Sequence, residues 1–231
     1  MSQEENQLTS ALGDYIKLEN LISSADIEKC LEEVSIDKRY TIVRQVRDRF
    51  DNTSLWWAVY RDDIKTVKVI LSALESDHLY KLLMLKRNNI FHKLASSGNL
   101  ELVKKIVRSI TQDQKHILII RKDMEGNSPI ISAVSNGHTE IVSYLLGVLN
   151  NLQRFDLLKL KNKQGNTALH MAVCKRHVGT LKVMLDSITP IQRYRILTST
   201  GKYDDAVLSE ASRMYRDNCI STRRRSFYRR D

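Results

Sequence analysis

The chain has 231 residues, of which 42% are hydrophobic and 28% are charged, and its formal net charge at pH 7 is +10. This length and composition are typical of one or two soluble globular domains. No apolar run approaches the roughly 20 residues that cross a bilayer, so we predict no transmembrane segment. Only two prolines and eight glycines interrupt the chain, which favours helices with short turns over a many-stranded sheet.

Charge and cysteines indicate the kind of partner and compartment. Residues 1–50 carry a net charge of −3 and residues 221–231 carry +4, so the middle of the chain carries +9. This basic balance favours an acidic or polyanionic partner. Cys30, Cys174 and Cys219 lie far apart and fit reduced thiols better than a disulfide framework or a zinc site. Gln3, Glu4 and Glu5 follow the initiator Met and do not fit a cationic, apolar signal peptide, so we expect none.

We expect a flexible N-terminus over residues 1–14 and an N-terminal cap over 15–50. Within the cap, LISSADIEKCLEEV (21–34) is a degenerate echo of LASSGNLELVKKIV (94–107). Degenerate end copies are typical of stacked repeats, where they cap the core.

Four clearer copies follow, starting at Thr53, Asn89, Ser128 and Thr167, which are 36, 39 and 39 residues apart. The units begin at about residues 51, 87, 126 and 165, and a last degenerate copy at about 204–220 is expected to cap the C-terminal end. Self-similarity at a fixed period predicts a repeat architecture.

Each copy predicts two helices. The Thr or Ser at the first position can cap the first helix, and Pro129 suits a first turn. Nine residues after the start, Gly137 suits a left-handed residue at the end of that helix. Asp62 and Arg176 replace this glycine and weaken the turn prediction in their copies. The second helix shows one apolar stripe at helical spacing.

A further element separates the copies. TQDQKHILI (111–119), NNLQRFDLL (150–158) and TPIQRYRIL (189–197) align with each other, and 35–43 and 75–83 are weaker relatives. Capping boxes are predicted at three pairs: Thr111 with Gln114, Asn150 with Gln153, and Thr189 with Gln192. We therefore predict a short extra helix, or a restarted helix, after each second helix.

Each extra helix carries an aromatic residue or a histidine followed by two apolar residues, which we expect to lengthen the core. A basic residue precedes the ring in four copies. These residues form a predicted basic ladder: Arg39, Lys115, Arg154 and Arg193. The ladder is either a solvated ridge or an anion-binding stripe.

The motifs NTALHMA (166–172), GNSPI (126–130) and GHTEIV (137–142) resemble ankyrin repeats, and the resemblance covers roughly residues 15–220. The predicted fold class is therefore all-α: a single-domain ankyrin-repeat solenoid of stacked helix-turn-helix units with short extra helices between repeats. The lengthened repeat also looks similar to ankyrin proteins of host-associated intracellular bacteria.

The resemblance implies that partners bind at the finger tips and on the inner face of the first helices. The finger positions are Arg49, Phe50, Lys86, Met124, Glu125, Lys163, Gln164, Lys202 and Tyr203, and the inner-helix positions are Tyr60, Arg61, Cys174 and Lys175. The alternative is ordinary finger and cap surface. Mixed basic and aromatic residues are common at interface hot spots, which favours a binding role.

Motifs for catalysis and cofactor binding were not found. The chain has no Gly-rich phosphate loop, no G-x-S-x-G elbow and no H-E-x-x-H, so we predict no enzyme activity, no cofactor and no metal. The resemblance implies structural hydrogen bonds for His92 and His170. Cys174 lies beside Lys175 and Arg176, but no base is arranged to activate it, which favours an incidental thiol over a nucleophile.

Two segments leave alternatives open. Trp56 and Trp57 are the only tryptophans, and we favour one of them sealing the groove against the N-terminal cap over a ligand platform. The basic tail, residues 221–231, is expected to be disordered. Its alternatives are a nuclear-import-like cluster, a nucleic-acid or anionic-lipid contact, and phosphorylation at Ser226.

The predicted function is a non-enzymatic adaptor that binds an acidic protein, with a host-directed effector role as one form of it. The alternative is a polyanion binder, for nucleic acid or phosphoinositide, that uses the basic ladder and the Arg-rich tail. We expect a monomer in the cytoplasm or another reducing compartment, with the nucleus or secretion into a host cell as alternatives.

Overall fold

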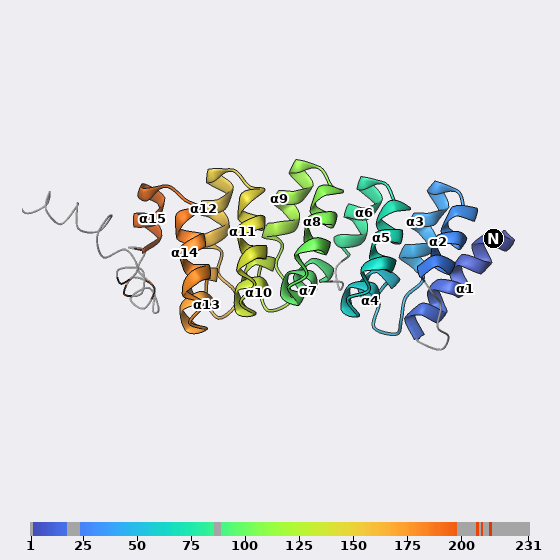
Figure 1. Ribbon diagram of the computed structural model, residues 1–231, viewed down its shortest axis with the longest axis horizontal. Helices are drawn as coiled ribbons and strands as arrows, with labels where there is room; N and C mark the ends of the chain where they lie inside the picture. The colour runs from blue at the N-terminus through green and yellow to red at the C-terminus, as the bar shows by residue number, and fades with distance from the viewer. Residues whose placement is uncertain are drawn as a thin grey trace, which may run out of the picture. The chain divides into compact units, whose positions relative to one another are not determined.

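A computed structural model describes residues 2–17, 24–85 and 89–197, together with Val207, Ser209 and Arg213. Residues 1–118 and 119–231 form two compact units, which are described separately. The division falls inside one of the extra helices. Figure 1 labels the helices in chain order.

The first unit contains an N-terminal group of three helices and then two repeats. Its helices are α1 (Gln3–Lys17), α2 (Ser24–Glu33), α3 (Ile36–Gln45), α4 (Ser54–Tyr60), α5 (Ile64–Ser72), α6 (Ser76–Leu83), α7 (Ile90–Ser97), α8 (Leu100–Arg108) and most of α9 (Gln112–Ile120). Successive first helices pack on each other, as α4 does on α7, and so do the second helices α5 and α8.

The described residues of the second unit contain two repeats of the same design. Its helices are α10 (Pro129–Ser135), α11 (Thr139–Gly147), α12 (Asn151–Lys159), α13 (Ala168–Cys174), α14 (Val178–Asp186) and α15 (Pro190–Leu197). Here α10 packs on α13 and α11 packs on α14. Within each unit the first, second and extra helices form three rows (Figure 1). The predicted all-α class, with stacked helix-turn-helix units and extra helices, is confirmed.

The start of the chain differs from the expected flexible N-terminus, because α1 begins at Gln3. Leu8 and Leu12 are completely buried, and α1 packs on α2, α3 and α4. The Lys38 ammonium pairs with the Glu5 carboxylate at 2.5 Å and fixes α1 to α3. Apolar residues four positions apart, such as Leu8 and Leu12, lie on one face of a helix. This apolar face covers the end of the stack, and no repeat motif in the sequence predicted it.

The turn between the first and second helices keeps its conformation where glycine is missing. Asp62 and Arg176 have φ of 57° and 58°, in the same left-handed region as Gly137 at 77°. In the last copy the His177 amide donates to the Ala172 carbonyl at 2.8 Å, which closes the turn. The left-handed conformation costs a non-glycine residue about 1–2 kcal/mol, so the packed helices impose the turn on these two residues.

The predicted caps of the first helices are confirmed in two copies. The side chains of Thr53 and Thr167 accept from the backbone amides three residues later. Ser128 does not cap α10, and its hydroxyl is buried without a hydrogen-bond partner. Pro129 follows it in the first turn, where the missing N–H leaves one fewer donor to satisfy.

The predicted extra helices are present in every copy, as α3, α6, α9, α12 and α15. All three predicted capping boxes form. In each box the glutamine side chain accepts from the backbone amide of Thr111, Asn150 or Thr189 at 3.0–3.1 Å. The glutamines also join neighbouring extra helices, since Gln114 Nε2 donates to the Asp77 carboxylate at 2.7 Å.

The extra helices lengthen the core, as predicted. The apolar pair that follows each ring is buried in every copy: Ile42 and Val43, Leu82 and Leu83, Leu118 and Ile119, Leu157 and Leu158, and Ile196 and Leu197. The short third helix therefore adds apolar surface to each repeat, and this explains a period longer than the about 33 residues of an ordinary repeat of this kind.

Candidate partner-binding site

The first finger is held against the first repeat by one carboxylate. Asp48 Oδ1 accepts from the backbone amides of Phe50 at 2.8 Å and Asn52 at 2.9 Å. Its Oδ2 accepts from the Trp57 indole nitrogen at 3.0 Å. The Arg49 guanidinium lies 4.8 Å from the centre of the Phe50 ring. The finger tip and the inner face of α4 are thus joined into one surface.

The same finger recurs twice in the second unit. Asp123 Oδ1 accepts from the Glu125 amide at 2.9 Å, and Asn162 Oδ1 accepts from the Gln164 amide at 3.0 Å. The signal for these turns is present in the sequence as DRFDN (48–52), DMEGN (123–127) and NKQGN (162–166). The first residue of each pattern lies one position before Arg49, Met124 or Lys163, so the predicted finger positions do not include it.

Adjacent fingers of the second unit are bonded to each other. The Lys163 amide donates to the Glu125 carbonyl at 3.0 Å. Gly126 has a φ of 78°, and a Cβ atom there would lie 2.8 Å from the Lys163 nitrogen. Glycine is therefore required at this position by both the backbone conformation and the close approach of the next finger.

Three rings cluster on α4. Trp56 and Tyr60 are stacked with ring centres 4.9 Å apart and planes 13° apart. Trp57 meets Trp56 edge-on at 5.1 Å and Tyr60 edge-on at 5.5 Å. Both tryptophans are half-buried and Tyr60 is exposed. The interpretation that one tryptophan seals the groove against the N-terminal cap stays a prediction.

Cations surround these rings. The Arg61 guanidinium lies 4.8 Å from the centre of the Trp57 ring, and the Lys93 ammonium, from α7 of the next repeat, lies 4.6 Å from the centre of the Tyr60 ring. Cation–π contacts of this kind contribute about 0.5–1 kcal/mol at exposed sites. We call this surface the aromatic–cationic patch, and its members are Arg49, Phe50, Trp56, Trp57, Tyr60, Arg61 and Lys93.

Asp48 is ionised at neutral pH. Partial burial raises the pKa of its carboxyl, but hydrogen bonds from Asn52, Phe50 and Trp57 together outweigh burial, so the pKa of Asp48 is lowered overall. A carboxyl with a lowered folded-state pKa stabilises the fold above its unfolded pKa of about 3.9. That stabilisation is lost as the pH falls through the lower folded-state pKa.

We therefore expect the free energy of unfolding of Asp48→Asn to fall less steeply below about pH 4 than that of the native chain. Asparagine keeps the Oδ1 acceptor, as Asn162 does in the last finger. Urea unfolding at several pH values between about pH 3 and about pH 6 measures how steeply the free energy of unfolding of each chain falls with pH. Parallel pH profiles for the two chains would show that protonation of Asp48 does not cause the loss of stability at low pH.

The predicted binding residues of the second unit lie on its surface. Met124 is 78% exposed, and Glu125, Lys163, Gln164, Cys174 and Lys175 are also exposed. Met124 and Glu125 occupy one finger tip, Lys163 and Gln164 the next, and Cys174 and Lys175 follow at the end of α13. Lys86, Lys202 and Tyr203 lie outside the described residues.

The basic ladder has a structural use that sequence reasoning missed. Arg154 Nε donates to the Leu146 carbonyl in the last turn of α11 at 2.7 Å. Its Nη1 donates to the Ser187 carbonyl at the end of α14 at 3.2 Å. One guanidinium therefore joins the ends of two successive second helices, where carbonyls lack helical partners and a positive charge is favourable.

The other ladder arginines make the same kind of bond. Arg193 Nε donates to the Leu185 carbonyl at 3.0 Å, and Arg39 Nε donates to the Val34 carbonyl at 2.8 Å. Lys115 differs, with a hydrogen bond to a neighbouring glutamine at 3.5 Å. The interpretation of the ladder as an anion-binding stripe stays a prediction, but three of its four members bind backbone carbonyls.

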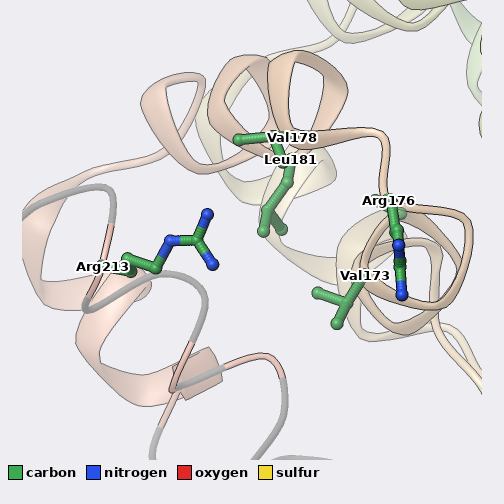
Figure 2. Close-up of a pocket in the computed structure, with 6 residues that line it drawn as sticks. Val173, Arg176, Val178, Leu181 and Arg213 are labelled. Carbon is green, nitrogen blue, oxygen red and sulfur yellow. The ribbon is translucent and has the colours of Figure 1, made fainter.

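A cavity of about 330 Å³ lies against α13 and α14. It is lined by Ala172, Val173, Arg176, Val178, Leu181 and Arg213. Figure 2 shows the apolar side chains of Val173, Val178 and Leu181 on one side and the Arg213 guanidinium pointing toward them from the other. The cavity occupies the face on which a further repeat would stack.

The two repeat histidines are buried, each 6% exposed. His170 Nδ1 is 3.2 Å from the Thr167 amide, which donates to it, and 2.7 Å from the Thr167 hydroxyl. These bonds confirm the predicted structural role of His170. Within the described part of the chain, no three His, Cys, Asp or Glu side chains are grouped to hold a metal ion, and no helix there has the length and apolar character of a membrane span.

Comparison with known protein families agrees with the repeat pattern. Residues 91–193 match the family model described as ankyrin repeats (3 copies). The match runs from α7 through the start of α15 and covers the copies whose motifs are clearest in the sequence. No curated protein matches the chain.

Proposed function

We propose that this ankyrin-repeat protein is a non-enzymatic scaffold that binds a protein with an acidic surface. Ankyrin repeats generally serve as protein–protein interaction modules, and proteins built from them are typically not enzymes. A stack of repeats presents a pre-formed surface, so a partner does not have to order it on binding. The finer part of the proposal, the acidic partner, rests on the exposed surface of this chain.

The observation that carries the proposal is the combination of exposed aromatic and basic side chains on the fingers and first helices. Phe50 is 62% exposed and Tyr60 is 52% exposed, and Arg49, Lys163 and Lys175 are exposed as well. Aromatic residues and arginine are enriched at interface hot spots. Positive charge around them favours association with an acidic partner.

The alternative function, a polyanion binder that uses the basic ladder and the Arg-rich tail, has less support. The ladder arginines donate to helix-end carbonyls, and the tail lies outside the described residues. A host-directed role, a monomeric state and a particular compartment stay predictions.

Affinity capture from a cytosolic lysate, with and without nuclease treatment, tests the proposal. The native chain is compared with a variant in which Arg49, Arg61, Lys86, Lys163 and Lys175 are changed to Glu. A control variant carries the same change in net charge at exposed residues of the second and extra helices: Lys65, Lys105, Arg108, Lys182 and Arg195, all changed to Glu. We expect one protein to be captured by the native chain and the control variant and lost in the first variant.

Two results would count against the proposal. Equal loss in both variants would mean that binding follows net charge rather than the finger surface. Capture that disappears on nuclease treatment would favour the polyanion binder, whose affinity should also fall steeply with salt.

A further inference from the structure

The aromatic–cationic patch combines stacked rings with cation–π contacts. Elsewhere on the described surface these contacts occur one at a time, as a stacked pair of Tyr40 and His78 and a contact of Lys159 with Phe155. Two half-buried indoles, an exposed phenol and an exposed finger phenylalanine lie together with three cations. The cations come from three places in the chain: Arg49 from the finger, Arg61 from the end of α4 and Lys93 from α7. A surface of this composition can bury an apolar group and pair acidic groups at the same time.

The arrangement of the rings indicates which chemistry fits. Trp56 stacks on Tyr60, and the Lys93 ammonium lies over the Tyr60 ring. The Arg61 guanidinium similarly lies over Trp57. These contacts occupy part of the ring faces of Trp56, Tyr60 and Trp57, which leaves less open ring surface for a nucleobase, which binds by stacking.

The cations beside the rings add positive charge to this surface. The edge of an aromatic ring is the positive part of its quadrupole. Positive edges and nearby ammonium and guanidinium groups favour carboxylates, and the apolar surface between them favours one aliphatic or aromatic side chain.

We propose that the aromatic–cationic patch is the docking point for an extended peptide segment in which Asp or Glu residues flank one large apolar side chain. This inference rests on the proposed function and names the partner segment that the first repeat would take. The apolar side chain packs against Trp56, Trp57 and Phe50, and the carboxylates pair with Arg49, Arg61 and Lys93.

The patch is organised before the peptide arrives. Asp48 holds the finger backbone at Phe50 and Asn52 and binds the Trp57 indole. The rings are already stacked, so few side chains lose freedom when a peptide binds. Side chains that are ordered in advance lose less conformational entropy on binding, which favours tighter binding.

The two tryptophans of the patch are the only ones in the chain, which provides a local reporter. Tryptophan emission, excited at a wavelength where tyrosine does not absorb, reports on the patch alone. Fluorescence anisotropy of a labelled peptide reports binding anywhere on the full-length chain. The probes are short synthetic peptides without tryptophan: acidic residues flanking Leu-Phe, the same peptide with Lys for the acidic residues, and the same peptide with Ser for Leu-Phe. A single-stranded oligothymidine is the fourth probe.

We expect the acidic Leu-Phe peptide to bind, to change the tryptophan emission, and to bind at least about tenfold more tightly than either peptide control. Tyr60→Ala, and separately Arg61→Glu with Lys93→Glu, should each weaken this binding about tenfold or more. A variant with Lys182→Glu and Arg195→Glu, exposed residues of the second and extra helices that carry the same change in charge as Arg61→Glu with Lys93→Glu, should bind as the native chain does. Tyr60 and Arg61 are not in the core, and circular dichroism checks that each variant is folded.

The possible failures can be told apart. Peptide binding that leaves the tryptophan emission unchanged and is lost when Met124→Ala and Lys163→Glu are introduced on the fingers of the second unit overturns this inference but leaves the proposed function standing. Tight binding of oligothymidine at the patch, with no binding of the acidic peptide, overturns both. Absence of any change in emission with the acidic peptide also overturns the inference.

Discussion

Replacing Phe91 with alanine is expected to lower the free energy of unfolding by about 3–5 kcal/mol. Phe91 is 2% exposed and belongs to the largest fully buried side chains of the described residues. It lies in α7, which packs on α4. The substitution removes the apolar contacts of the ring and leaves a cavity that the surrounding helices can fill only in part.

Urea unfolding followed by circular dichroism measures this change. Phe50→Ala is the matched control, because the same side chain is removed at a position that is 62% exposed. Its effect on stability should stay within about 0.5 kcal/mol. Similar losses in the two variants would show that the Phe91 side chain is not buried in the core as described. The pair also separates fold from function, since Phe50→Ala should weaken partner binding without unfolding the chain.

The second large effect is expected for Arg154→Met, which should lower the free energy of unfolding by about 2–4 kcal/mol because two carbonyls lose a charged hydrogen-bond donor. These carbonyls belong to Leu146 and Ser187, at the ends of α11 and α14. Methionine keeps much of the length and apolar stem of arginine, so the loss reports mainly on the hydrogen bonds. Thermal or urea unfolding of the two chains provides the measurement.

Lys115→Met is the control on the same ladder, because Lys115 has a hydrogen bond of 3.5 Å to Gln112. We expect its stability to change by no more than about 0.5 kcal/mol. If Arg154→Met is as stable as the native chain, the arginine does not hold the helix ends together. In that case the anion-binding interpretation of the ladder gains weight, and the variant should be tested for loss of polyanion binding.

Much of the architecture was predictable because its determinants are local. The capping boxes at Asn150 and Thr189 link residues three positions apart. The buried apolar pairs of the extra helices follow from helical spacing within one turn. A repeat pattern multiplies such local signals, so that weak copies are supported by strong ones. The left-handed conformation of Arg176 was less certain from sequence, since packing imposes it on a residue that does not favour it.

The candidate site was predictable only in part. The resemblance gave the positions of Phe50 and Tyr60, but it did not indicate that Asp48 joins the finger to Trp57. It also gave no reason to include Lys93, which reaches Tyr60 from the next repeat. A contact between residues 33 positions apart depends on how two repeats stack, and no pattern inside one repeat encodes it.

The sequence by itself determined the repeat, its two helices, the added third helix and the basic, aromatic character of the surface, because caps, turns and apolar stripes act within a few residues. Only the tertiary structure decided that α1 is packed against the first repeat, that Arg154 joins two helix ends, and that rings and cations meet in one patch. These depend on which side chains the stacked helices bring within contact distance. Such contacts cross repeat boundaries and have no local signature in the chain.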